Sequence, residues 1–361
     1  MSDGQKRLQE LRILIDGLDE RIQDLISQRA RCAQEIATIK HQSGAENFYR
    51  PEREAQVLRA VMERNHGPLA SEEMARLFRE IMSACLALES PMKVVFLGPE
   101  GTFTQAAALK HFGHSARTVP LGAIDEIFRE VESGSADFGV VPVENSTEGV
   151  VNHTLDMFMV SDLRICGEVE LRIHHHLLGL GEGLDGRKRI VSHQQSLAQC
   201  REWLDANLPA LERLNVASNA EAARMAAADP ALLAIAGGPA AEIYGLQKLV
   251  SNIEDEPDNT TRFLVIGRIE TQPSGDDKTS LLLSGQNRSG ALVGLLAPLA
   301  RHGINMTRIE SRPSRRGLWE YVFFVDIAGH VCDANVQQAI DELGQEAAFV
   351  RRLGSYPKAV L

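Results

Sequence analysis

The first 42 residues contain the feature that constrains the fold most, a run without proline whose apolar side chains recur every three or four positions. This spacing predicts one helix over residues 5–42, about 57 Å long at 1.5 Å per residue. A helix of that length is too long for a compact unit of about 90 residues to cover on both sides, so we expect a second copy of the chain to pack against it. The apolar seam consists of Leu8, Leu11, Ile15, Leu18, Ile22, Leu25, Cys32, Ile36 and Ile39.

Two further helices are expected to complete an all-α segment over residues 1–91. Pro51 predicts the start of the second helix, because proline is tolerated in a first helical turn, and the sequence Asn-His-Gly-Pro at 65–68 predicts its end. Ser71, which two glutamates follow, is expected to cap a third helix that stops before Pro91.

One position of the long helix, Arg29, places a cation on the apolar seam. A buried cation is costly unless it meets an anion, so Arg29 either pairs with a carboxylate that sets the helix register or belongs to an anion site. Lys40 shares its face about 16 Å along the helix, whereas Arg12 points about 100° away and can serve such a pocket only from a second, antiparallel chain. Arg53 and Glu54 add a cation and a carboxylate, a set that suits a dianion with a hydroxyl group.

Helix-like and strand-like stretches alternate over residues 92–268, which predicts an α/β domain with largely parallel sheets and two lobes. Polar side chains follow or open several of its strands, the usual place for a ligand in such sheets. In the glycine-rich loop at 98–104 a helix cap is favoured over an anion-binding site. The candidate side chains are Thr102, Asn145, Ser146, Thr261 and Arg262.

The last part of the chain predicts a third domain. Residues 269–278 are polar and contain proline and glycine, which is typical of a linker. Residues 279–356 then follow the order β-α-β-β-α-β of ferredoxin-like folds. Gly290 is expected to start the first helix of this domain.

Composition argues against several classes of protein. With 38 Lys and Arg against 49 Asp and Glu, the formal charge is −11, which disfavours a nucleic-acid binder. No uncharged stretch approaches the roughly 20 apolar residues of a membrane span, and we expect no secretory signal. Five scattered cysteines are typical of free thiols in the cytoplasm. His174-His175-His176 has no further ligand at metal spacing, so we expect no metal and no cofactor.

The helical segment resembles the all-helical chorismate mutase module, on the motif LRILIDGLDERIQDLISQRARCAQEIATIK followed by RPERE. The resemblance implies an intertwined homodimer with two pockets, in which Arg12 reaches the pocket of the partner chain. It also implies that Arg29 and Arg53 lie near the substrate carboxylates. By the same resemblance Lys40 binds the ether oxygen of chorismate, and Glu54 binds its hydroxyl group.

Three other positions differ from the familiar pattern of that family. Cys85 replaces a serine, Glu89 replaces a glutamine that binds the ether oxygen, and Arg50 replaces an aspartate. We expect Glu89 to act in catalysis, and Cys85 and Arg50 to contact the substrate. The implied rearrangement of chorismate to prephenate needs no nucleophile, metal or cofactor, because confinement and well-placed cations suffice.

The motifs GPEGTFT, VVPVENSTEG, SHQQSLAQC and TTRF resemble prephenate dehydratase across residues 93–268. The resemblance implies two lobes like those of a periplasmic binding protein. Prephenate would lie between them and lose carbon dioxide and water to give phenylpyruvate. It also implies one catalytic threonine and four substrate contacts. These are Thr261 and, as contacts, Thr102, Asn145, Ser146 and Arg262.

The motifs Gly290-Ala291-Leu292-Val293 and Glu310-Ser311-Arg312-Pro313 resemble the regulatory ACT domain that binds phenylalanine. The resemblance implies an effector site at a subunit interface. Together the three resemblances imply a cytoplasmic, bifunctional chorismate mutase and prephenate dehydratase of phenylalanine biosynthesis, inhibited by phenylalanine. A rival hypothesis is an amino-acid sensor without catalysis. Such a sensor would be free to lose Thr261 and the mutase cations, and all of them are present.

Overall fold

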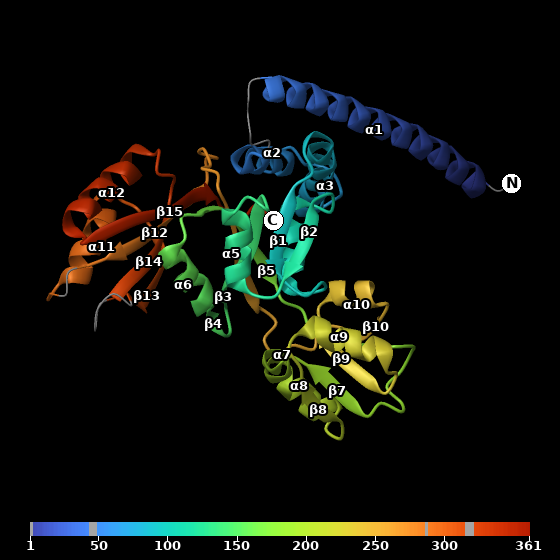
Figure 1. Ribbon diagram of the computed structural model, residues 1–361. Helices are drawn as coiled ribbons and strands as arrows, with labels where there is room; N and C mark the ends of the chain where they lie inside the picture. The colour runs from blue at the N-terminus through green and yellow to red at the C-terminus, as the bar shows by residue number, and fades with distance from the viewer. Residues whose placement is uncertain (1–2, 43–48, 286–287, 315–320) are drawn as a thin grey trace.

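The computed structural model of the chain describes residues 3–42, 49–285, 288–314 and 321–361. A helical segment, an α/β domain of two lobes and a four-stranded domain follow one another along the sequence (Figure 1). The helical segment consists of α1 (Asp3–Gln42), α2 (Pro51–Glu63) and α3 (Ser71–Glu89).

The cap of α3 differs from the prediction. Ser71 is the first residue of this helix, and Ala70 is its N-cap without a side-chain hydrogen bond, so the predicted serine cap is wrong.

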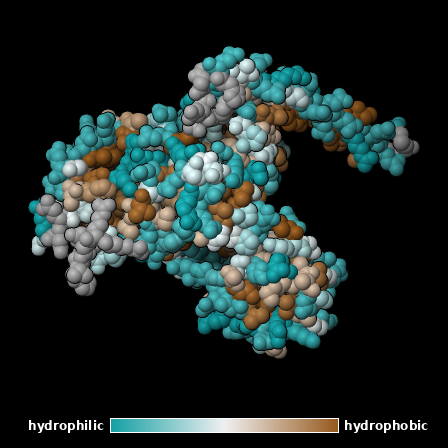
Figure 2. Space-filling model, in the orientation of Figure 1, coloured by the Kyte–Doolittle hydropathy of each residue, from teal (hydrophilic) through white to brown (hydrophobic). Residues whose placement is uncertain are grey.

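Helix α1 projects away from the rest of the protein and packs against α3 only near its C-terminal end (Figure 1). Ala33 and Ala37 are buried in that contact. The residues of the predicted apolar seam are exposed to solvent, and Figure 2 shows hydrophobic side chains along this helix. A continuous apolar face of this kind is a surface that a partner would cover. The exposed fractions are 43% for Leu18, 55% for Ile22 and 61% for Leu25.

The first lobe of the α/β domain contains a six-stranded sheet in the order β2-β1-β3-β11-β5, with β4 beside β3. Helix α4 covers one face of this sheet, and α5 and α6 cover the other. The strands are β1 (Lys93–Leu97), β2 (Arg117–Leu121), β3 (Phe138–Asn145), β4 (Gly149–Val150), β5 (Arg164–Arg172) and β11 (Thr260–Gly267). The helices are α4 (Phe103–Phe112), α5 (Ile124–Glu132) and α6 (Asn152–Val160).

The second lobe contains a five-stranded sheet in the order β10-β6-β9-β7-β8. The chain enters this lobe after β5 and returns before β11, so two segments connect the lobes. Its strands are β6 (His176–Gly179), β7 (Arg189–Ser192), β8 (Glu212–Asn215), β9 (Leu232–Ala236) and β10 (Gln247–Val250). Its helices are α7 (Gln194–Gln199), α8 (Arg201–Asn207), α9 (Asn219–Ala228) and α10 (Gly238–Tyr244).

Both sheets mix parallel and antiparallel pairs, so the prediction of largely parallel sheets is wrong. Strands β1 and β3 are parallel, as the alternating pattern predicts. Strand β11, however, returns from the second lobe and inserts antiparallel between β3 and β5. Strands β6 and β10 are antiparallel in the second lobe. These pairings join segments far apart in the sequence, and the local pattern carries no sign of them.

The C-terminal domain confirms the predicted order β-α-β-β-α-β, with a sheet in the order β13-β14-β12-β15. Helices α11 and α12 pack together and share a hydrophobic core with this sheet. The strands are β12 (Asp277–Ser284), β13 (Met306–Pro313), β14 (Tyr321–Ala328) and β15 (Phe349–Pro357). The helices are α11 (Ala291–Arg301) and α12 (Ala334–Glu346).

The C-terminal domain packs closely on the first lobe. Phe324 and Leu353 share one hydrophobic core with Leu264 of β11. A Cβ atom at Gly354 would lie 2.2 Å from the carbonyl oxygen of Ile165, so glycine at this position allows β15 to approach β5. The two domains therefore form one packed unit.

The predicted linker is also part of this packing. Thr271, Ser274 and Asp277 are buried, and β12 already begins at Asp277. Arg59 of α2 donates hydrogen bonds to the carbonyl oxygens of Ser274 at 3.1 Å and Asp276 at 2.8 Å. Residues 269–278 thus join the helical segment to the C-terminal domain and do not form an independent tether.

Candidate active sites

Arg29, Lys40 and Glu89 lie together where the C-terminal half of α1 packs against the end of α3. Burial raises the pKa of the Glu89 carboxyl, and the nearby charges of Lys40 and Arg29 oppose this rise. Cys85, one turn before Glu89, is buried. Two cations beside a carboxyl group that holds its proton more readily than usual are suited to binding a dianion.

Arg12 does not join this cluster within one chain. It lies on the exposed part of α1, 17 residues before Arg29, which is about 26 Å along an α-helix. Figure 1 shows that this part of α1 contacts no other element of the same chain. The Arg29 cluster is therefore open to a residue of a second chain.

Three of the predicted mutase residues, Arg50, Arg53 and Glu54, lie at the start of α2. Arg53 is exposed, and Arg50 forms an ion pair with Glu52 at 3.7 Å. Glu54 accepts a hydrogen bond from Arg79 Nε at 3.2 Å, with its side chain only 15% exposed. Burial raises the pKa of Glu54, and the Arg79 charge opposes the rise. Glu54 therefore faces Arg79 in this chain, and its expected contact with the substrate hydroxyl stays a prediction.

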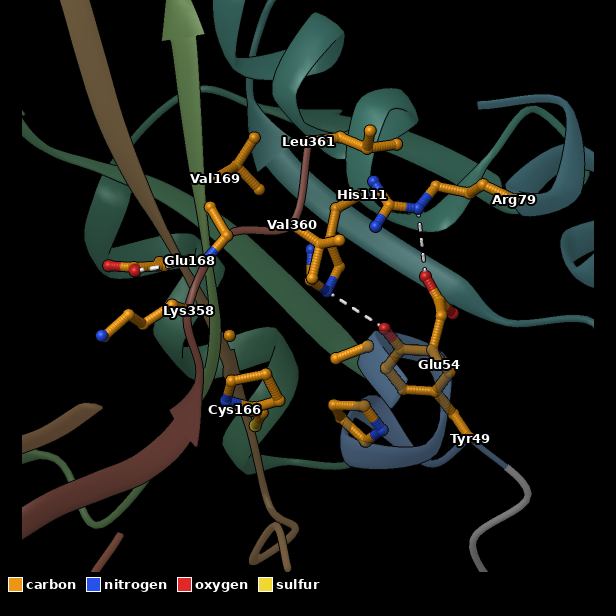
Figure 3. A pocket seen from close by; sticks show the side chains of 15 residues that line it. Tyr49, Glu54, Arg79, His111, Cys166, Glu168, Val169, Lys358, Val360 and Leu361 are labelled. Carbon is orange, nitrogen blue, oxygen red and sulfur yellow. Dashed lines mark hydrogen bonds and ion pairs between the residues drawn. The ribbon is translucent and has the colours of Figure 1, made fainter. Parts of the chain in front are cut away.

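Figure 3 shows that the Glu54–Arg79 pair lines a pocket between domains. Tyr49 Oη lies 3.0 Å from His111 Nε2 of α4, and Arg79 donates to the Lys110 carbonyl at 2.6 Å. Burial lowers the pKa of His111 to about 3, so its ring is neutral. The C-terminal residues line the same pocket. These contacts fasten the helical segment to the α/β domain.

Strands β3 and β11 bring Asn145 and Thr261 directly opposite one another. Asn145 Nδ2 donates to Thr261 Oγ1 at 2.7 Å and to Asn259 Oδ1 at 2.8 Å. Asn145 Oδ1 accepts from the backbone N–H groups of Thr147 and Glu148, each at 3.0 Å, which fixes the amide orientation. Because Thr261 Oγ1 accepts from Asn145, its own hydroxyl proton is available to a further acceptor.

Four residues that the sequence analysis did not select as site residues extend this network to the second lobe: Asn259, Gln199, His175 and Glu148. Gln199 Oε1 accepts from Asn259 Nδ2 at 3.2 Å and lies 2.9 Å from His175 Nε2. Gln199 Nε2 donates to Glu148 Oε1 at 3.4 Å. Burial lowers the pKa of His175, which keeps its ring neutral. Gln199 stands in the motif SHQQSLAQC, and Asn259 directly precedes the two threonines of TTRF, so the motifs themselves held the signal.

Thr102 and Ser146 bind backbone groups of the loops beside this network. Thr102 Oγ1 accepts from the N–H of Gln105 at 3.4 Å and donates to the Leu97 carbonyl at 3.1 Å. The favoured interpretation of Thr102 as a helix cap is confirmed. Ser146 Oγ accepts from the N–H of Thr260 at 2.9 Å. Their expected contacts with a substrate stay predictions.

Arg262 lies on the opposite face of β11 from Thr261, because successive side chains of a strand alternate. Its guanidinium binds Glu168 at 2.9 Å, Asp326 at 2.6 Å and the hydroxyl of Tyr356 at 3.0 Å. The structure thus turns Arg262 toward the C-terminal domain and away from Thr261, whereas the sequence analysis expected both to contact the substrate. The alternation alone could have shown that Thr261 and Arg262 do not face the same site.

The two effector motifs lie in the C-terminal domain. Gly290 adopts a left-handed conformation, with a φ of 77°, directly before α11, and Ala291, Leu292 and Val293 form the first turn of that helix. The second motif ends β13. Arg312 forms an ion pair with Asp156 of α6 at 2.5 Å. The second motif, Glu310, Ser311, Arg312 and Pro313, is thus tied to the first lobe.

The histidine run has a structural role. Glu254 lies 2.7 Å from His174 Nδ1 and accepts from the N–H of His175 at 2.9 Å. Within the described ranges, no three His, Cys, Asp or Glu side chains are grouped as a metal site. The helices of that part of the chain also include none long and apolar enough to cross a membrane.

Comparisons with known protein families match the three parts of the chain separately. Residues 11–90 match the model of chorismate mutase type II, and residues 94–271 match that of prephenate dehydratase. Residues 279–345 match the ACT domain.

Individual relatives match over longer stretches. A bifunctional chorismate mutase/prephenate dehydratase of Stutzerimonas stutzeri is 61% identical, over 98% of this chain and 99% of the relative. The protein of the same description from Pseudomonas aeruginosa is 59% identical, over 99% of both chains. The solved structure of prephenate dehydratase from Arthrobacter aurescens in complex with L-Phe has a TM-score of 0.69 and 36% identity, and covers 74% of this chain and 90% of that chain.

Proposed function

We propose that this chain, which belongs to the family of bifunctional chorismate mutase/prephenate dehydratases, catalyses two consecutive reactions of phenylalanine biosynthesis. The helical segment rearranges chorismate to prephenate, and the α/β domain converts prephenate to phenylpyruvate, carbon dioxide and water. The observation that carries this proposal is that one chain holds both the Arg29, Lys40 and Glu89 cluster and a Thr261 hydroxyl oriented by Asn145.

The first reaction needs no covalent help from the protein. As the carbon–oxygen bond of chorismate breaks, negative charge develops on the ether oxygen, and cations stabilise that charge more in the transition state than in the ground state. Arg29 and Lys40 supply the cations, and protonated Glu89 donates a hydrogen bond to the same oxygen. Arg12 of a second copy completes the pocket.

The remaining mutase residues are proposed to contact the substrate in the completed pocket. Cys85 is buried close to Glu89, which supports a role for it in lining the pocket. Arg53 is exposed and Arg50 lies at the edge of α2, so their proposed contacts require the surface that a partner chain provides.

The second reaction consumes one proton, because the hydroxyl group leaves the ring as water. Prephenate loses its ring carboxylate as carbon dioxide, and the electron pair of that bond makes the ring aromatic and expels the C4 hydroxyl group, which leaves as water once protonated. Thr261 donates a hydrogen bond to the departing oxygen. Asn145 binds the threonine oxygen and so leaves the threonine proton free for this contact. Asn259 and Gln199 hold this arrangement across the two lobes.

The C-terminal domain is proposed to bind phenylalanine as a feedback inhibitor. The relative from Arthrobacter aurescens was solved in complex with L-Phe, and it covers the dehydratase and ACT parts of this chain. The two effector motifs would bind the amino acid at an interface between two ACT domains. The ion pair of Arg312 with Asp156 connects one motif to the dehydratase lobe.

A homodimer is proposed from the exposed apolar face of α1, which a second copy of the same helix would cover. The cytoplasm is proposed as its compartment, because all five cysteines are free and two of them, Cys32 and Cys332, are exposed.

One experiment tests both activities. The purified chain is incubated with chorismate, and prephenate and phenylpyruvate are followed by chromatography with and without phenylalanine. We expect prephenate first, then phenylpyruvate, with phenylalanine suppressing the second product. Unchanged chorismate with a folded protein would contradict the mutase assignment. Prephenate that accumulates without phenylpyruvate would contradict the dehydratase assignment.

A further inference from the structure

A buried group of polar side chains, here called the β11 cluster, joins the strand that carries Thr261 to the ACT domain. Arg262 is its centre and bridges Glu168 of β5 to Asp326 of β14 and Tyr356 of β15. The side chains of Arg262, Glu168 and Asp326 are 12%, 1% and 7% exposed. The β11 cluster comprises Arg262, Glu168, Asp326, Tyr356, Lys278 and Ser280.

The remaining members complete the hydrogen bonds and balance the charges. Lys278 Nζ lies 2.9 Å from Glu168 Oε2, so two cations face two carboxylates. Ser280 Oγ lies 2.5 Å from Asp326 Oδ1 and 2.7 Å from Tyr356 Oη. Burial alone would raise the pKa of Asp326, but the Arg262 charge and the hydrogen bonds from Ser280 and Arg262 lower it below its usual range. Such a network is stable only while all its members stay in place.

The β11 cluster meets β11 beside one of the two register shifts of this strand. The register of β11 on β3 shifts between Arg262 and Phe263, as in a β-bulge. On the β3 side the backbone ladder therefore constrains β11 less, whereas its ladder to β5 stays in register from Thr260 to Val265. Arg262 is the neighbour of Thr261, so a backbone shift at Arg262 would also move the threonine relative to Asn145.

The effector motif is connected to the same contacts. It lies on β13, which pairs with β14, and Arg308 of β13 is the register partner of Asp326. Arg308 also forms an ion pair with Glu144 of β3 at 2.8 Å, one residue before Asn145. A shift of β13 would therefore act on β3 through Glu144, and on β11 through Asp326 and Arg262.

We propose that Arg262 is a positioning residue of the dehydratase, through which the ACT domain holds Thr261 in place and through which an effector changes that position. This inference rests on the proposed role of Thr261. Arg262 itself contacts no substrate, because its side chain points away from Asn145 into the β11 cluster.

The test uses two variants in the ACT domain that leave β11 unaltered. Asp326→Asn removes one charge partner of Arg262, and Tyr356→Phe removes the hydroxyl that binds both Arg262 and Ser280 while keeping all four charges. Arg352→Gln is the matched control, because Arg352 forms an ion pair with Glu270 at the same domain boundary without touching the β11 cluster. For each full-length protein we would measure the dehydratase kcat and KM, the phenylalanine concentration for half inhibition, the mutase rate and Tm.

We expect Asp326→Asn to lower the dehydratase kcat and to raise the half-inhibiting phenylalanine concentration, each about tenfold, with KM changed less than about twofold. Tyr356→Phe should change the same two quantities about threefold, and Arg352→Gln should change neither. The half-inhibiting concentration does not depend on the amount of active enzyme, so a merely destabilised protein would not shift it. The mutase rate should stay at its wild-type value.

Two results would overturn the inference: wild-type kcat and inhibition in both ACT variants, or equal effects in Arg352→Gln. If Asp326→Asn does not fold, Tyr356→Phe decides, since it keeps the charges balanced. Failure of the proposed function is distinguishable, because it would appear as full dehydratase activity in Thr261→Ala, whatever the ACT variants do.

Discussion

The two candidate active sites differ in how much of each site one chain supplies. The network around Thr261 is built from β3, β11 and the segments between the lobes, all within one chain. The cluster of Arg29, Lys40 and Glu89 lies on helices whose apolar face is open to solvent. A dehydration needs a hydrogen bond held in a fixed direction, which a sheet provides, whereas a pericyclic rearrangement needs cations around a confined substrate, which two chains can share.

The largest expected effect is at the dehydratase site, which one chain completes. Thr261→Ala should lower the dehydratase kcat on the order of 10²–10³-fold, because it removes the donor to the departing hydroxyl group. The mutase rate of the same sample should be unchanged. Thr260→Ala is the control, because its hydroxyl donates to the Asp258 carbonyl outside the network. Wild-type dehydratase rates in Thr261→Ala, measured as phenylpyruvate formed from prephenate, would contradict the assignment.

An intermediate effect is expected at the effector motif. Glu310→Ala should raise the phenylalanine concentration for half inhibition about tenfold or more, because it removes a proposed ligand contact. The dehydratase rate without phenylalanine should stay the same. Glu342→Ala is a matched control in the same domain, since Glu342 pairs with Arg301 at the far end of α11. Equal inhibition of Glu310→Ala and wild type would place the effector elsewhere.

The smallest expected effect is a pH dependence of the mutase alone. Burial raises the pKa of Glu89, and only its protonated form donates a hydrogen bond to the ether oxygen. The mutase kcat/KM should therefore fall as pH rises through that pKa, while the dehydratase need not follow. Glu89→Gln, whose amide donates at any pH, should flatten the profile and raise the alkaline rate. Glu35→Gln on the exposed side of α1 should leave the profile as it is.

A flat mutase profile in the wild type, unchanged in Glu89→Gln, would remove Glu89 from the ether-oxygen role. It would leave the Arg29 and Lys40 assignments standing, since the substitution alters neither cation.

Local patterns in the sequence predicted the features that depend on residues close together in the chain. The three-and-four spacing of apolar residues predicted α1, and the alternation of strands and helices predicted the order of the C-terminal domain. Thr261 and Asn145 were both selected from motifs, and in the structure Asn145 Nδ2 lies 2.7 Å from Thr261 Oγ1.

Features that depend on contacts between distant segments were missed. The sheets mix directions because β11 returns from the second lobe. Glu54 meets Arg79 because α2 packs against α3, and no spacing within α2 shows that contact. Arg262 was expected from the motif TTRF to contact the substrate, whereas strand alternation turns its side chain toward the ACT domain.

The central claim is that the mutase site needs two chains whereas the dehydratase site needs one. It is tested most directly by mixing Arg12→Ala chains with Arg29→Ala chains after reversible dissociation. Each variant alone should be nearly inactive as a mutase. In a random mixture half of the dimers are hybrids with one intact site, so about a quarter of the wild-type mutase activity should return. Dehydratase activity should not change on mixing. No recovery of mutase activity, with hybrid dimers demonstrated by mass spectrometry, would contradict the shared site.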